Sequence, residues 1–286
     1  MWVEIGVSRW RCFAVARFSG QARIGVYSNT AVRSTKREPL GPMAHQPCDL
    51  FLGEMTIMKL TWLGHAAFHI GVDGADLLID PFWTGNPTYP TVFEDRLAKV
   101  DAIFVTHGHE DHIGDTVRLA KKYGSTVVAQ PEICGFVARS GHDKFEEMNT
   151  GGTLTLGACE VSMVPAFHSS AIMENGRLVG SSDPVGFILA GGSHTIYHAG
   201  DTGIFGDMAL IQRIYKPNIG LIPIGDRYTM GPTLAAYACN ELLNLETIIP
   251  IHWGTFPALS GKPEKFRSLV KRGTVLVMTP GEAAEI

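Results

Sequence analysis

The sequence predicts an α/β protein that forms a four-layer αββα sandwich, in which two β-sheets pack face to face and helices cover both outer faces. Short apolar runs of strand length alternate with segments of helical periodicity. A strand-rich stretch followed by strand–helix units occurs once and is then repeated. Residues 68–80 also resemble residues 187–201, each with a glycine-bearing hairpin inside. Two similar halves packed sheet against sheet explain this weak internal repeat.

The expected elements begin at Met58, where Met58-Lys-Leu-Thr-Trp-Leu opens directly into a strand. Alternating and apolar runs predict strands at residues 58–63, 66–72, 75–79, 100–106, 126–129, 153–156, 160–164, 185–190, 195–198, 219–224, 247–251 and 274–278. Helical spacing, together with initial prolines and terminal glycines, predicts helices at residues 113–122, 131–139, 204–214, 233–243 and 263–271.

The composition is that of a globular protein with a sizeable core, at 286 residues with 45% hydrophobic and 18% charged side chains. No apolar stretch approaches the roughly 18 residues that span a bilayer, so we expect a soluble protein without a transmembrane segment. The cysteines are widely spaced, odd in number and form no C-x-x-C pair, which is typical of reduced thiols in the cytoplasm. They are Cys12, Cys48, Cys134, Cys159 and Cys239.

Residues 1–57 are interpreted as an N-terminal extension that precedes a single domain at residues 58–286. The extension carries seven Lys and Arg against four Asp and Glu and ends in a Pro- and Gly-rich stretch. An Arg-rich, acid-poor segment is typical of an organelle transit peptide. The alternative, which we prefer because a strand opens at Met58, is a mis-assigned start, with translation beginning at Met55 or Met58. In either case we expect this segment to be poorly ordered.

The charge of residues 58–286 argues against a nucleic-acid substrate. This region holds 17 basic and 24 acidic side chains. A domain that binds nucleic acid has to neutralise phosphates and usually shows a basic surplus. We therefore expect a small-molecule substrate and no nucleic acid, and the sequence leaves a homo-oligomer open.

The central motif is a cluster of histidines directly after the predicted strand at residues 100–106. It reads Thr106-His107-Gly-His109-Glu-Asp111-His112. Imidazole nitrogens and carboxylate oxygens are ligands that suit zinc and similar divalent ions. The first two histidines are two residues apart, so a loop at a strand end can turn both toward one point, while the last two residues face a second point nearby. A single histidine at a strand end is usually an ordinary polar residue, but four such groups in one loop have no comparable structural explanation.

Three further segments follow the cluster in a recognisable order, each after a predicted strand. They are Pro165-Ala-Phe-His168-Ser, His198-Ala-Gly-Asp201-Thr and Pro250-Ile-His252-Trp-Gly. Residues 58–286 thus resemble the metallo-β-lactamase superfamily, whose signature is H-x-H-x-D-H followed by isolated His, Asp and His. The resemblance implies the metallo-β-lactamase fold, which is an αββα sandwich.

Several flanking strings narrow the resemblance. They include Thr61-Trp-Leu-Gly-His65, Leu78-Ile-Asp80-Pro81, His198-Ala-Gly-Asp-Thr-Gly203, Ile224-Gly-Asp-Arg-Tyr-Thr-Met-Gly-Pro232 and His252-Trp-Gly-Thr-Phe-Pro257. Together they resemble a family of bacterial and archaeal metal-dependent hydrolases. That family is related to the L-ascorbate 6-phosphate lactonases and the N-acylphosphatidylethanolamine phospholipases. The resemblance extends from Met58 almost to the end of the chain.

The resemblance implies a site for two metal ions with seven protein ligands. One ion would be held by His107, His109 and His168, the second by Asp111, His112 and His252, and Asp201 would bridge both. Zinc is the default, although Mn²⁺, Fe²⁺ or Ni²⁺ also accept such ligands. A water molecule between the ions would become a bridging hydroxide that attacks an ester, lactone or phosphoester bond. Asp111 would carry a proton to the leaving group.

The remaining candidate residues are supporting ones. The resemblance suggests that His65 borders the mouth of the active site with a catalytic role. Asp80 either forms a simple Asp-Pro turn or holds a metal-bound histidine, and we expect His198 to pack rather than to bind metal. Asp226 and Arg227 precede Gly231 in an expected active-site loop, where they would contact substrate and Arg227 would hold an anionic group. The alternative is that Arg227 is a solvated loop charge.

Three other functions are alternatives to a metal-dependent hydrolase of esters, lactones or phosphoesters. A phosphodiesterase acting on lipid or nucleotide esters would use the same metals, and a lipid substrate predicts an exposed apolar groove beside them. A flavodiiron-type oxidoreductase is disfavoured because position 109 is His and no flavodoxin-like domain follows Ile286. A non-catalytic metal-binding protein normally loses ligands, whereas all seven are present here.

Overall fold

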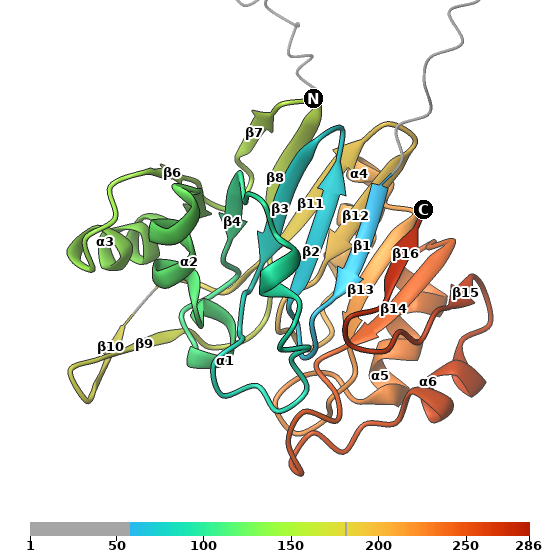
Figure 1. Cartoon of the computed structure of the whole chain (residues 1–286). Coiled ribbons are helices and arrows are strands. Elements are labelled where there is room, and N and C mark those ends of the chain that lie inside the picture. Colours follow the sequence, from blue (N-terminus) through green and yellow to red (C-terminus); the bar gives the residue numbers. More distant parts are fainter. Residues whose placement is uncertain (1–57, 181) are drawn as a thin grey trace, which may run out of the picture. The chain divides into compact units, whose positions relative to one another are not determined.

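The computed structural model describes residues 58–180 and 182–286 (Figure 1). The interpretation of residues 1–57 falls outside the described residues and stays a prediction. Within the described ranges, no helix combines the length and apolarity needed to cross a bilayer. Cys134, Cys159 and Cys239 are buried free thiols, and burial raises the pKa of Cys239 to about 12.

The first sheet has seven strands in the order β16-β1-β2-β3-β4-β5-β6. Their bounds are β1 (Met58–Trp62), β2 (Phe68–Val72), β3 (Ala75–Ile79), β4 (Ala102–Phe104), β5 (Thr126–Ala129), β6 (Phe145–Glu147) and β16 (Ala283–Glu285). Strands β16, β1, β2 and β3 pair antiparallel, and β3 through β6 pair parallel. The sheet therefore has an antiparallel half and a parallel half.

The second sheet also has seven strands, in the order β15-β14-β13-β12-β11-β8-β7. Their bounds are β7 (Thr153–Leu156), β8 (Cys159–Pro165), β11 (Val185–Gly191), β12 (His194–His198), β13 (Ile219–Pro223), β14 (Thr247–Ile251) and β15 (Thr274–Val275). Strands β7, β8, β11 and β12 are antiparallel, and β12 through β15 are parallel. The two sheets thus share one plan, which accounts for the weak sequence repeat.

Alternating side chains along the strands build three apolar layers. The central layer joins both sheets, with Leu60, Phe104 and Ile79 of the first sheet packed among Phe187 and Leu221 of the second. The outer layers lie beneath helices. This arrangement confirms the predicted αββα sandwich (Figure 1).

The helices cover the two outer faces of the sandwich. On the first sheet lie α2 (Thr116–Tyr123) and α3 (Pro131–Arg139), and on the second lie α4 (Met208–Tyr215), α5 (Pro232–Tyr237), the π-helical turn η2 (Ala238–Leu242) and α6 (Pro263–Leu269). Two short elements, η1 (Glu94–Arg96) and α1 (Glu110–Ile113), belong to connecting loops. Pro occupies the first turn of α3, α5 and α6, where its missing N–H costs no hydrogen bond.

The expected helix at residues 113–122 is wrong at its start. The chain instead forms α1, breaks at Gly114 and resumes as α2. Gly114 has φ 35°, and a Cβ at this position would lie 2.7 Å from the Pro81 carbonyl oxygen, so the helix cannot continue past this close approach. The helix expected at 204–214 begins only at Met208, and that expected at 233–243 ends in the π-helical turn.

Four strands were not expected from the sequence: β6, β16 and the hairpin of β9 (Ala171–Glu174) and β10 (Arg177–Gly180). The hairpin forms a separate two-stranded sheet, and every residue of β10 is exposed. Strand β10 therefore lacks the alternation of buried and exposed residues that identifies a half-buried strand. The strand expected at 274–278 shortens to two residues.

Six strands that run in the same direction end at one edge of the sandwich. These are β1, β3 and β4 in the first sheet and β8, β12 and β14 in the second. The loops that follow them carry His65, Asp80, His107, His168, Asp201 and His252. Ligand sites of α/β proteins commonly lie at the carboxyl ends of strands, and this edge carries the candidate residues.

Candidate metal centre

The loop after β4 places the first group of histidines. His107 is fully buried behind β4, and His109 is half-buried at the N-cap of α1. Their Nε2 and Nδ1 atoms face each other at 3.0 Å. His168 belongs to the loop after β8. A hydrogen bond from the Gly108 N–H to Ser170 Oγ joins that loop to the loop after β4. One nitrogen from each of the three histidines lies within 4.8 Å of the other two.

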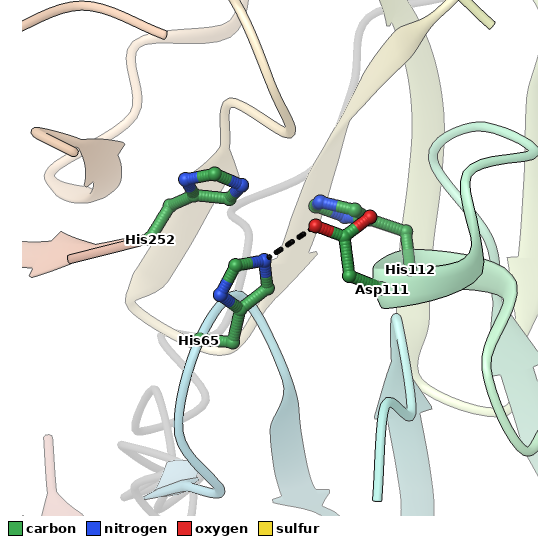
Figure 2. A group of neighbouring side chains, drawn as sticks. All are labelled: His65, Asp111, His112 and His252. Atoms are coloured by element: carbon green, nitrogen blue, oxygen red, sulfur yellow. Dashed lines mark hydrogen bonds and ion pairs between the residues drawn. The ribbon is translucent and has the colours of Figure 1, made fainter. Parts of the chain in front are cut away.

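A second group forms beside the first. Asp111 and His112 start α1, His252 follows β14 and His65 follows β1, and Figure 2 shows their side chains converging. Donor atoms of these four side chains lie within 4.8 Å of one another. His65 is fully buried, and both of its ring nitrogens form hydrogen bonds. Nε2 lies 3.2 Å from Asp111 Oδ2, and Nδ1 lies 2.9 Å from Thr255 Oγ1. His65 is thus buried beside Asp111 within this group, and its catalytic role stays a prediction.

Asp201 lies between the two groups. Its Oδ1 is 3.3 Å from His112 Nε2, and its Oδ2 is 2.9 Å from His252 Nε2 and 3.6 Å from His168 Nε2. His112 Nε2, His252 Nε2 and Asp201 Oδ1 are all buried, and apart from these ion-pair contacts none of them makes a hydrogen bond. Buried polar atoms without partners are costly, and a divalent cation between them would satisfy all three. The buried His and Asp donors therefore fit a divalent cation.

Asp80 organises the buried side of the centre. Its Oδ1 accepts the Thr106 N–H at 2.8 Å, and its Oδ2 accepts the Thr106 hydroxyl at 2.7 Å and His112 Nδ1–H at 2.7 Å. Thr106 Oγ1 in turn lies 3.0 Å from His107 Nδ1. These bonds hold a proton on Nδ1 of both His107 and His112, and both Nε2 atoms face the centre. The Nε2 of His112 offers a lone pair to a cation once it has lost its own proton. Asp80 thus holds a histidine rather than forming only a turn.

Replacing Asp80 with Asn is expected to weaken metal binding by about 10–100-fold, because an amide N–H facing His112 Nδ1 favours the tautomer with its proton on Nε2. Isothermal titration of metal-free protein with Zn²⁺ measures the change. Asp101→Asn, at an exposed position, serves as the control. Unchanged affinity in Asp80→Asn would contradict the assigned tautomer.

Burial and charge set the protonation of the centre. Burial lowers the pKa of His107 well below its ordinary value and also lowers the pKa values of His109 and His168, which leaves their nitrogens free to bind a cation. Burial also acts against a charge on His112, but Asp201 and Asp80 outweigh it and raise the pKa of His112 well above its ordinary value. Metal uptake therefore competes with a proton at His112.

Three residues of the centre adopt left-handed backbone conformations. His65, Asp80 and His252 have φ values of 55°, 46° and 55°. Such conformations cost on the order of 1–3 kcal/mol each and persist where surrounding contacts fix them. The His65 carbonyl oxygen accepts hydrogen bonds from the His252 N–H at 2.9 Å and from Trp62 Nε1–H at 3.1 Å. These bonds fix the backbone conformations of His65 and His252.

Gly200 is required to bring Asp201 into the centre. Its φ is +61°, and a Cβ here would lie 2.5 Å from the Val185 carbonyl oxygen. Gly200→Ala is expected to lower the free energy of unfolding by roughly 2–4 kcal/mol, as measured by urea denaturation. Gly157→Ala is the matched control, because Gly157 has φ +59° with nothing within 4 Å. Equal losses in both variants would show that the close approach at Gly200 does not matter.

The other candidates lie apart from the ligand groups. His198 is fully buried, with Nε2 2.9 Å from the Ala66 carbonyl oxygen and Nδ1 accepting the Gly200 N–H, as expected of a packing residue. Asp226 and Arg227 are exposed in the loop after β13. That loop borders the centre, because the Met230 N–H donates to the Thr202 carbonyl oxygen. Their role in substrate contact stays a prediction.

Sequence reasoning did not assign Thr106 and Thr255, which hold His107 and His65. Both threonines stand inside the quoted motifs, so their position in the sequence offered a signal. The sequence alone does not show which histidine each threonine hydroxyl contacts, because that depends on how the loops pack in the folded protein.

Comparison with known proteins places this geometry in a family. The β-lactamase superfamily domain matches residues 76–253. A UPF0173 metal-dependent hydrolase of Methanopyrus kandleri is 44% identical over 232 residues, covering 80% of this chain and 100% of the relative. Another from Rhizobium meliloti is 45% identical over 228 residues, covering 78% and 97%. The structure of Igni18, a metallo hydrolase from Ignicoccus hospitalis, aligns with a TM-score of 0.70 and 36% identity, covering 81% and 99%.

The two-sheet sandwich with His and Asp side chains gathered at one edge defines a protein of the metallo-β-lactamase fold. The chain belongs to the β-lactamase superfamily and, within it, to the UPF0173 metal-dependent hydrolases. The expected fold and superfamily are confirmed.

Proposed function

We propose that this protein is a hydrolase that uses two divalent metal ions to cleave an ester, lactone or phosphoester bond of a small substrate. The observation that carries the proposal is the convergence of seven ligating side chains from four loops around buried atoms that lack hydrogen-bond partners. His107, His109 and His168 would hold one ion, and Asp111, His112 and His252 the other, with Asp201 between them. Zinc is the default ion.

When bound, two such cations lower the pKa of a water molecule and stabilise negative charge on the attacked group. The chain's own residues then position the reaction. Asp111 lines a surface cavity and is the candidate to pass a proton to the leaving group. His65 Nε2–H donates to Asp111 Oδ2, and the Thr255 hydroxyl donates to His65 Nδ1. These two hydrogen bonds in series fix the orientation of the Asp111 carboxylate.

The environment of His65 suits this positioning role. Burial, together with the nearby His252, lowers the pKa of His65 to about 4. The ring is therefore neutral at pH 7, with one donating and one accepting nitrogen. Against the opposing effect of burial, the hydrogen bond from His65 keeps the pKa of Asp111 below its ordinary value.

A screen of lactones, phosphodiesters and thioesters against metal-loaded protein tests the proposal, with Asp201→Ala as the blank. We expect turnover of at least one class that is lost in the variant and on chelation. Turnover that is equal in Asp201→Ala, or absent for all three classes in a protein loaded with metal, would overturn the proposal.

A further inference from the structure

A large cavity opens beside the candidate metal centre. Its volume is about 870 Å³, and His109 and Asp111 form part of its wall. Much of the remaining wall is apolar and aromatic, with Phe82 and Phe256 near the centre and Phe136 farther along α3. This size and lining are typical of pockets that enclose a small organic molecule and orient it with a few polar groups.

The hairpin of β9 and β10 supplies one side of this cavity, and Figure 1 shows it extending from the sandwich near α1 and α3. Met173 and Leu178 face each other across its two strands and both line the cavity. Their side chains are 41% and 72% exposed, although both are large and apolar. Buried Ile172 packs into the core beneath α3, and Arg139 pairs with Glu174 at 3.3 Å, so the hairpin is anchored. Its apolar pair is thus held toward the cavity.

In the protein without metal ions, the ionisable wall of the cavity disfavours anions. Its ionisable lining residues, among the described part of the chain, are His109, Glu110, Asp111 and Asp115, with no Lys or Arg among them. Without bound cations, a carboxylate or phosphate placed against these carboxylates would lose hydration and meet like charge. An uncharged hydrocarbon group would instead gain from leaving water.

We propose that this cavity binds an uncharged acyl chain of the substrate, with Met173 and Leu178 covering it and the bond to be cleaved lying toward His109 and Asp111. The inference rests on the proposed hydrolase function and narrows it to substrates that carry an apolar chain. Leu178 is the principal specificity residue, because it is the most exposed large apolar side chain on the wall.

Binding to metal-free protein tests this assignment without any turnover. The neutral fluorescent probe N-phenyl-1-naphthylamine is displaced by 1-butanol, 1-hexanol or 1-octanol, and each alcohol's affinity is measured. We expect affinity to rise about fourfold per methylene group. Octanoate should bind at least tenfold more weakly than 1-octanol. Equal binding of octanoate, or no dependence on chain length, would overturn the assignment.

Two matched variants locate the site. Leu178→Asp is expected to weaken 1-octanol binding on the order of tenfold, whereas Ile214→Asp should leave it unchanged. Ile214 is 64% exposed on α4 and does not line the cavity. Leu178→Ser, which adds no charge, repeats the test with a smaller expected loss. Unaltered 1-octanol binding in both Leu178 variants would show that the alkyl chain binds at another place on the protein.

Turnover separates failure of this inference from failure of the proposed function. With metal-loaded protein and p-nitrophenyl esters from acetate to decanoate, kcat/KM should increase with chain length. Leu178→Asp should flatten this increase, whereas Ile214→Asp, away from the cavity, should retain it. Turnover with no chain-length dependence would retain the hydrolase and reject the acyl site. Chain-length-dependent binding without any hydrolysis would retain the acyl site and reject the hydrolase.

Discussion

Asp201→Ala is expected to lose bound metal and hydrolytic turnover together. Its carboxylate is the side chain that approaches members of both ligand groups, with Oδ1 at His112 and Oδ2 at His252 and His168. Metal ions supply several kcal/mol of transition-state stabilisation in such centres. Since 1.36 kcal/mol corresponds to a factor of ten, loss of about 4 kcal/mol lowers kcat on the order of a thousandfold. Elemental analysis and ester or phosphodiester turnover on the same sample measure both quantities.

Two further variants make this result interpretable. Asp201→Asn keeps the size of the side chain and one oxygen, so it should retain the fold and bind more metal than Asp201→Ala. Asp207→Ala, at an exposed position six residues later, should change neither quantity. A variant at position 201 that keeps full turnover after losing its metal would contradict the role assigned to Asp201.

Removal of metal is expected to lower the melting temperature by on the order of 10 °C. His112 Nε2, His252 Nε2 and Asp201 Oδ1 are buried, and no protein hydrogen bond satisfies them. Ligand present at a thousandfold excess over its Kd stabilises the folded state by about 4 kcal/mol. For a domain of this size, 1 kcal/mol shifts the melting temperature by about 2–4 °C.

Differential scanning calorimetry before chelation, after chelation and after addition of Zn²⁺ measures this shift. Chelator that has been saturated with Ca²⁺ controls for effects of the chelator itself. The shift should disappear in Asp201→Ala. An equal melting temperature with and without metal would show that the buried atoms gain no partner from it.

The fold was predictable from the sequence because its strands carry clear apolar patterns and its repeat is visible. Strands β3, β5, β7 and β14 occur at the predicted bounds, as does α3. The hairpin of β9 and β10 was not predictable, since Met173 and Leu178 face a cavity rather than the core. The break at Gly114 depends on the approach of Pro81, which a local pattern cannot reveal.

The ligand groups were predictable for a different reason. Burying several histidines in one loop costs free energy unless they share a binding partner. His107, His109 and His112 therefore predict a metal centre without help from the rest of the sequence. His168 and His252 could be assigned only through the resemblance, because each stands alone in its segment. The depth of His65 and the bonds from Asp80 to His112 and Thr106 depend on how loops from different strands meet. Such contacts require the folded chain.

The most direct measurement of the proposed centre is activity as a function of metal added to stripped protein. Equivalents of Zn²⁺ per chain are titrated by calorimetry while hydrolysis is followed on the same samples. Seven ligands in two groups joined by Asp201 predict two bound ions per chain and maximal turnover only as the second equivalent is added. Full turnover by a protein that holds one ion or none would contradict the two-metal centre.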